Sequence, residues 1–241
     1  MSKIVGLLFW FSLMLLIVSF WNRNQFPDDI QPVAALHDEP QQSPLNKSPF
    51  SVQYENVQYD IEPQYDYDIY GLVVSYKHHS GDSMLHKLWN DHLNMTDVCI
   101  VWGETAINRY LNEFDFWNGQ FTCNIKTQSR RAWNSFNMNQ LSNNHLLSND
   151  EFIRKKVKEI NIGDQIRIKG YLSSYGSEGG GKRGTSTVRT DTGNGACETI
   201  FIKEFDIVRK GKSYWRTSMH FSLFLLMFAV IIYFVLPHKV N

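Results

Sequence analysis

A thiol, an imidazole and a carboxylate in the middle of the chain could together form a nucleophilic centre. Cys197 would supply the nucleophile, His145 the base, and Asp191 the group that orients the base. No family-specific signature surrounds Cys197, and a buried cysteine that acts as a small apolar side chain explains the same sequence. A membrane-bound hydrolase that uses these residues is therefore the alternative prediction, and no residue is assigned as catalytic.

Asp191 also begins the triplet Asp191-Thr192-Gly193, which is the triplet of aspartic proteases. Those enzymes bring two such loops together, so that two carboxylates share a proton. This chain has one triplet, and the residues before it, Arg189 and Thr190, are not apolar. Because Asp, Gly and Asn favour turns, the sequence indicates a polar turn here.

Polar and basic residues favour binding over catalysis. Residues 142–145 offer side-chain amides and an imidazole, and they are expected to form a loop. Basic residues lie beyond a strand expected at 165–174. An ordinary pair of solvated loops is the competing explanation. The predicted ligand-binding residues are Asn143, Asn144, His145, Arg183, Arg189 and Asp191.

Four histidines and two aspartates lie within residues 78–92, and side chains of these types could bind a metal ion. His86 and His92 are six residues apart, a spacing that does not place them on one helical face. An exposed polar segment is the simpler explanation. The sequence therefore predicts no metal and no cofactor.

Composition narrows the class of protein. The chain has 24 basic and 24 acidic residues, so its zero net charge gives no reason to expect nucleic acid as a partner. Three cysteines do not make a disulfide framework, and their spacing is not that of a zinc site. Either one disulfide forms, with Cys99 and Cys123 as the pair nearer in sequence, or all three thiols are buried.

An uncharged apolar run lies near each end of the chain, at residues 4–21 and 221–236. Each is long enough to cross a membrane as a helix. The first is interpreted as an uncleaved signal anchor, with a cleaved signal peptide as the alternative. The predicted segments are a span at 1–22, a proline-rich tether at 23–49, a globular domain at 50–208, a basic and aromatic membrane border at 209–218, and a second span at 219–237.

Hydrophobic periodicity in the globular domain predicts an α+β fold, with a mostly antiparallel sheet that could roll into an OB-like barrel and about three helices. Strands are expected at 51–61 with a break at Asn56, and at 69–76, 98–102, 119–125, 165–174, 185–190 and 199–208. Helices are expected at 84–93, at 105–116, and after a capping box formed by Ser148 and Glu151.

Three motifs carry a resemblance. Residues 141–146 read L-S-N-N-H-L, residues 163–170 read G-D-Q-I-R-I-K-G, and residues 191–198 read D-T-G-N-G-A-C-E. In this order they resemble a family of uncharacterised bacterial membrane-associated proteins, over residues 55–205. The glycine-aspartate strand alone also resembles a strand of small OB-like barrels. The family resemblance implies a bacterial envelope setting and no particular activity.

Together these features predict a membrane-anchored envelope domain that binds a protein partner or a polar polymer. The short N-terminal tail with Lys3 favours a domain on the periplasmic side of the bacterial inner membrane. The basic residues that precede the second span argue for the opposite orientation, but long domains translocate largely regardless of charge. A structural subunit of a membrane complex is a third interpretation, which no G-x-x-x-G pattern or intramembrane charge supports.

Overall fold

The computed structural model describes residues 3–27, 29–79, 89–178, 180–191 and 197–235. The chain divides into two compact units. The two terminal segments, Met1–Pro27 and Lys212–Asn241, form one unit, and Asp28–Gly211 forms the other.

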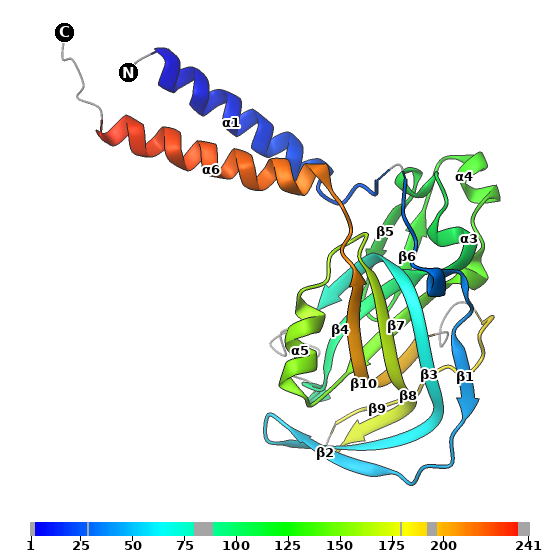
Figure 1. Cartoon of the computed structure of the whole chain (residues 1–241). Helices are drawn as coiled ribbons and strands as arrows, with labels where there is room; N and C mark the ends of the chain where they lie inside the picture. The colour runs from blue at the N-terminus through cyan, green and yellow to red at the C-terminus, as the bar shows by residue number, and fades with distance from the viewer. Residues whose placement is uncertain (1–2, 28, 80–88, 179, 192–196, 236–241) are drawn as a thin grey trace. The chain divides into compact units, whose positions relative to one another are not determined.

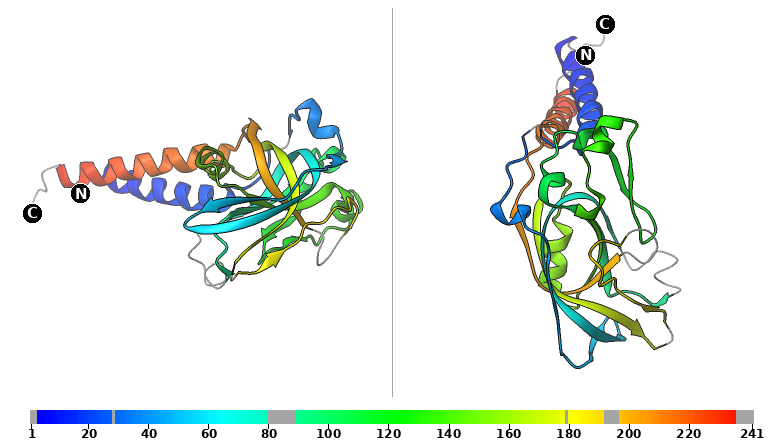
Figure 2. Two further views of the ribbon diagram at one scale, coloured as in Figure 1. Left: turned by 90° about the horizontal axis from the view of Figure 1, so that it is seen from below. Right: turned by 90° about the vertical axis from the view of Figure 1, so that its right-hand side faces the viewer.

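Two long apolar helices make up the terminal unit. Helix α1 (Lys3–Asn22) and helix α6 (Tyr214–Val235) run antiparallel and lie side by side (Figures 1 and 2). Both are long and apolar enough to cross a membrane, and they occupy the two predicted spans. Small side chains let the two helices approach closely. The small residues that are buried in these helices are Gly6, Ser12, Ser19, Ser222 and Ala229.

The second unit is built on an eight-stranded sheet. Its strands are β1 (Gln41–Pro44), β2 (Phe50–Tyr54), β3 (Val57–His78), β4 (Asn94–Val101), β7 (Leu141–Leu147), β8 (Gln165–Ser177), β9 (Lys182–Arg183) and β10 (Cys197–Arg209). A separate hairpin pairs β5 (Asp115–Asn118) with β6 (Cys123–Lys126). The α+β class and the mostly antiparallel pairing are confirmed.

Five of the strands pair in a closed circuit. Strand β3 pairs with β4, β4 with β7, β7 with β10, β10 with β8, and β8 returns to β3. All of these pairs are antiparallel except β7–β10. Strand β3 has 22 residues, and it curves across the sheet so that it reaches both β4 and β8 (Figure 1).

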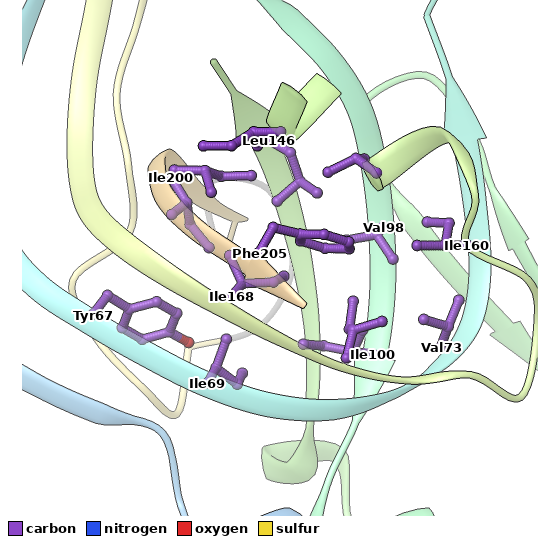
Figure 3. Packing of buried hydrophobic residues seen from close by; sticks show 14 of the residues in the cluster. Tyr67, Ile69, Val73, Val98, Ile100, Leu146, Ile160, Ile168, Ile200 and Phe205 are labelled. Carbon is purple, nitrogen blue, oxygen red and sulfur yellow. The ribbon is translucent and has the colours of Figure 1, made fainter. Parts of the chain in front are cut away.

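The main core lies inside this circuit (Figure 3). Aliphatic side chains from all five strands surround the ring of Phe205. Helix α5 (Glu151–Lys158) contributes Ile153 and Val157 to the same cluster. The buried residues labelled in Figure 3 are Tyr67, Ile69, Val73, Val98, Ile100, Leu146, Ile160, Ile168, Ile200 and Phe205.

Helix α5 begins where the sequence predicts, but its cap differs. The Asp150 carboxylate, not the Ser148 hydroxyl, accepts from the first free amides of the helix, at 2.8 Å from Phe152 N. Ser148 Oγ accepts instead from Asp150 N at 3.1 Å, so it orients the cap. The prediction of a Ser148 cap is therefore wrong by two residues.

The helix predicted at 105–116 is also wrong, because tertiary contacts end it after one turn. Helix α3 covers Gly103–Ala106, and β5 starts at Asp115. Gln140 Oε1 accepts from both the amide and the hydroxyl of Thr105, at 3.0 and 2.8 Å. A further short helix, α4, covers Arg130–Asn134. The helix predicted at 84–93 lies largely outside the described residues.

Two segments that were predicted to be irregular are ordered parts of the sheet. Residues 41–44 of the predicted tether form β1 and pair with β3, and Leu36 is buried. The Gln165 side chain bonds the backbone at Val33 and Gln31, so this stretch is held against the domain. The predicted loop at 142–145 is the central strand β7. Residues 185–190, in contrast, are not a strand; β9 lies at 182–183.

Candidate functional site

The candidate site lies on one face of three adjacent strands, β4, β7 and β10. Side chains alternate between the two faces of a strand, so Leu146 enters the main core while His145 points to the opposite face. The register places Asp97 beside His145, and Cys197 beside Asn143. These four side chains therefore share one face.

A buried carboxylate holds the imidazole in place. His145 Nδ1 lies 2.5 Å from Asp97 Oδ1, and both side chains are almost fully buried. Asp97 also accepts from Asn94 Nδ2 at 3.2 Å, and its second oxygen lies 3.1 Å from His79 Nε2. The Asp97 carboxylate therefore has three polar neighbours, His145, Asn94 and His79.

The charges in this cluster support one another. Burial opposes protonation of His145, but its hydrogen bonds to Asp97 and Cys197 outweigh burial and raise its pKa to about 9. Burial likewise opposes ionisation of Asp97, and the bonds to His145 and His79 reverse this and lower its pKa. The folded protein therefore favours a carboxylate paired with an imidazolium at neutral pH.

Cys197 begins β10, and it is partly exposed. Its sulfur accepts from Asn143 Nδ2 at 3.2 Å, and it lies 3.6 Å from the carbonyl oxygen of Phe121. His145 lies on the same face of the neighbouring strand β7, where its register partner on β10 is Thr199, two residues after Cys197. Two residues of the predicted nucleophilic centre, His145 and Cys197, thus lie near one another.

A disulfide fixes the β5–β6 hairpin beside this face. Cys99 on β4 is bonded to Cys123 on β6, which is the pairing that sequence proximity favours. Asn118 Nδ2 also donates to Cys99 Sγ, at 3.3 Å. The hairpin turn contains Phe121, whose ring packs edge-on to His145 at 5.9 Å between centroids. Phe121 has a left-handed backbone conformation (φ 59°), which is uncommon for a bulky residue.

Three residues form what we call the Arg183 stack: Trp89, Phe121 and Arg183. The Arg183 guanidinium lies 3.7 Å from the Phe121 ring centroid, and the Trp89 ring is parallel to that of Phe121 at 5.7 Å. Trp89 remains 42% exposed. Arg183 Nη1 is buried and has no hydrogen-bond partner among the described residues. The stack therefore combines an accessible aromatic surface with an unpaired cationic donor.

The other predicted binding residues lie elsewhere. Asn144 points to the opposite face of β7 and bonds the carbonyl oxygen of Val98. Arg189 pairs with the buried Glu198 at 2.6 Å and lies over the Trp102 ring. Asp191 accepts from Ser186 Oγ at 2.5 Å. The structure thus brings together Asn143, His145 and Arg183, whereas Asn144, Arg189 and Asp191 have other partners. The carboxylate that binds His145 is Asp97, not the predicted Asp191.

No known family model, curated protein or solved structure matches this chain. Asp97, Phe121 and Trp89 were not predicted as site residues. One signal in the sequence pointed to Asp97 as a site residue: it is a charged residue directly before the apolar run Val98–Trp102.

Proposed function

We propose that this chain holds an OB-like domain at a membrane, where the domain binds an anionic protein or polymer through the Arg183 stack. The observation that carries the proposal is the stack itself. In it a guanidinium lies against two aromatic rings, and its buried Nη1 has no partner in the described ranges of the chain. Arginine that is stacked in this way keeps its edge donors for a carboxylate or phosphate.

The strand circuit supports the OB-like part of the proposal. In chain order its strands are β3, β4, β7, β8 and β10, and such barrels bind ligands with the face of the second and third strands and with the loops after the first and fourth. Trp89 lies between β3 and β4, and Arg183 lies between β8 and β10. His145 and Asp97 lie on the second and third strands. The candidate site thus occupies the place that an OB-like ligand would use.

The terminal helices and the disulfide support the setting. Two antiparallel helices with membrane-spanning length would put both termini on one side and the folded unit on the other. Structural disulfides form in oxidising compartments, and Cys99–Cys123 therefore favours the periplasmic side of a bacterial inner membrane over the cytoplasm. An ordered β1 replaces the extended tether, so the linker from the first helix to the domain is short.

Site-specific photocrosslinking in living cells tests the binding surface. A photoreactive phenylalanine analogue placed at Trp89 should yield a discrete adduct, because that ring is accessible and lies beside Arg183. The same analogue at Phe152, which is exposed on α5, is the matched control and should yield none. An Arg183→Ala substitution should remove the adduct at position 89.

The proposal would be contradicted by equal crosslinking at both positions, or by an adduct at position 89 that persists in Arg183→Ala. Mass spectrometry of the adduct then identifies the partner. A partner without carboxylate or phosphate groups at the crosslinked segment would contradict the anionic class of ligand.

A further inference from the structure

Cys197 ends a line of three side chains that come from three adjacent strands. Asp97 on β4 binds His145 on β7, and Cys197 lies on the same face of β10, two residues before Thr199, the register partner of His145. The order follows from the sheet, because β7 lies between β4 and β10 in the strand circuit. A carboxylate, an imidazole and a thiol are thus arranged as orienter, base and nucleophile.

The imidazole is fixed in one orientation. Its Nδ1 is committed to Asp97 Oδ1 at 2.5 Å, and the Phe121 ring packs against its edge. Asp97 is itself held by Asn94 and His79, so the carboxylate has no freedom to turn away. When one ring nitrogen of a histidine is bonded to a carboxylate, the other is presented in a defined protonation state.

The surroundings of the thiol also point to a ligand. The Asn143 residue is 5% exposed, and its Nδ2 donates to Cys197 Sγ while its Oδ1 has no hydrogen-bond partner within the described part of the chain. A buried amide oxygen without a partner costs free energy unless a ligand or water completes it. Cys197 is partly exposed, whereas Cys99 and Cys123 are joined in the disulfide.

A structural cysteine is the competing explanation, since free cysteines are often buried as small hydrophobes. An inert cysteine is expected among apolar side chains. The Cys197 sulfur instead has two polar partners, namely the amide of Asn143 and the carbonyl of Phe121, and it is partly exposed. A nucleophilic thiol needs such an accessible, polar position.

We propose that Cys197 is a nucleophile that takes acyl groups from carboxylic esters, with His145 as its acid–base partner and Asp97 as the residue that positions His145. This activity goes beyond binding at the Arg183 stack, and it uses different atoms. It also replaces the Asp191 of the sequence-based alternative with Asp97.

The reaction proceeds in two balanced steps. The reaction starts from the thiolate of Cys197 and the protonated His145. The sulfur attacks the carbonyl carbon, a C–S bond forms, and the ester C–O bond breaks as His145 gives its proton to the leaving alkoxide. Water then gives a proton to the neutral His145 and its oxygen attacks the thioester. The C–S bond breaks, the sulfur leaves as the thiolate, and the products are an alcohol and a carboxylic acid. Asn143 Nδ2 donates to both Cys197 Sγ and the carbonyl oxygen of Phe121, so it holds the sulfur in place.

The test uses the full-length protein in detergent micelles with p-nitrophenyl acetate as the probe. We expect nitrophenolate release, and peptide mass spectrometry should find an acetyl group on Cys197. Cys197→Ala should lose both, and His145→Gln should slow release by about 100-fold or more. His92→Gln is the matched histidine control, because His92 pairs with the surface residue Glu55, and it should keep the wild-type rate.

The positioning role of Asp97 has its own readout. Asp97→Asn should lower kcat while KM stays unchanged, because the substrate does not touch this carboxylate. A change in KM alone would contradict the positioning role.

Alkylation provides a test that needs no variant to fold. Iodoacetamide should modify Cys197 and abolish turnover, since the other two cysteines are in the disulfide. Turnover that survives complete alkylation of Cys197, acetylation on other residues only, or an unchanged rate in a folded His145→Gln variant would each overturn the proposal. Crosslinking at position 89 is a separate measurement, so binding and catalysis can fail independently.

Discussion

Replacing Asp97 by Asn should remove a pH-dependent part of the stability of the folded unit. Asp97 and His145 are both buried, and their short contact raises the pKa of His145 from 6.5 to about 9. At about 1.4 kcal/mol for each unit of pKa, this corresponds to about 3 kcal/mol. The same interaction shifts the pKa of both Asp97 and His145, so its free energy is counted once. Asparagine keeps the size of the side chain but removes the charge that stabilises the imidazolium.

The sign of the pH dependence follows from the raised pKa. Protonated His145 is favoured in the folded state, so its contribution is complete below pH about 6.5 and is lost as the pH rises through about 9. The groups that face His145 are Asp97, Cys197 and Arg183, and of these Asp97 is the anion that binds it directly. The wild type should therefore exceed Asp97→Asn by about 3 kcal/mol at pH 6, and the difference should shrink towards pH 9.5.

Urea unfolding of the full-length protein in detergent, followed by tryptophan fluorescence, measures this difference. Glu62→Gln is the matched control, because its ion pair with Lys182 is exposed and should contribute less than about 1 kcal/mol at any pH. The reasoning would be refuted if Asp97→Asn lost no more stability than Glu62→Gln, or if the loss were the same at pH 6 and pH 9.5.

Three further variants test the core, the hairpin and a buried cation, each by urea unfolding. Phe205→Ala should lower the free energy of unfolding by about 3–5 kcal/mol, because the Phe205 ring is at the centre of the core. Phe152 is exposed, so Phe152→Ala should lower it by about 0.5 kcal/mol or less. Equal losses in the two variants would contradict the packing in Figure 3. The double variant Cys99→Ala/Cys123→Ala removes the disulfide, which closes a loop with a sequence separation of 24, and should lower the free energy of unfolding by about 3 kcal/mol. Thiol titration of the denatured wild type should find one free cysteine rather than three. Arg154→Met should lower the free energy of unfolding by about 3 kcal/mol, because it leaves three backbone carbonyls without the guanidinium that donates to them. An unchanged urea midpoint would show that these hydrogen bonds make no net contribution to stability.

The sequence predicted the strands whose apolar residues alternate. In β10, Ile200 and Ile202 lie in the core, as their alternation indicates. The hairpin between β2 and β3 was visible as a break at Asn56, and its two turn residues, Glu55 and Asn56, have positive φ. The alternation of apolar and polar residues was enough to predict these strands, because each of them buries one face.

Pattern failed where polar side chains are buried. Strand β7 has the sequence LSNNHLL, which reads as a loop, but Asn143, Asn144 and His145 find partners only when distant strands pair beside them. The same holds for the site: His145 and Cys197 were candidates by type, but their orienting carboxylate depends on the β4–β7 register, which brings residue 97 next to residue 145. A periodic run at 105–116 was misleading because Phe114 packs with Phe116 and Phe136 instead of continuing a helix.

The central claim is that both terminal helices hold the folded unit on the oxidising side of a membrane. Reporter insertion at residue 130, in the short helix α4, and a fusion at the C-terminus test it directly. Alkaline phosphatase, which is active only outside the cytoplasm, should be active at residue 130, and a fluorescent protein that requires the cytoplasm should be fluorescent at the C-terminus. Inactive phosphatase at residue 130 together with a dark C-terminal fusion would contradict the claim.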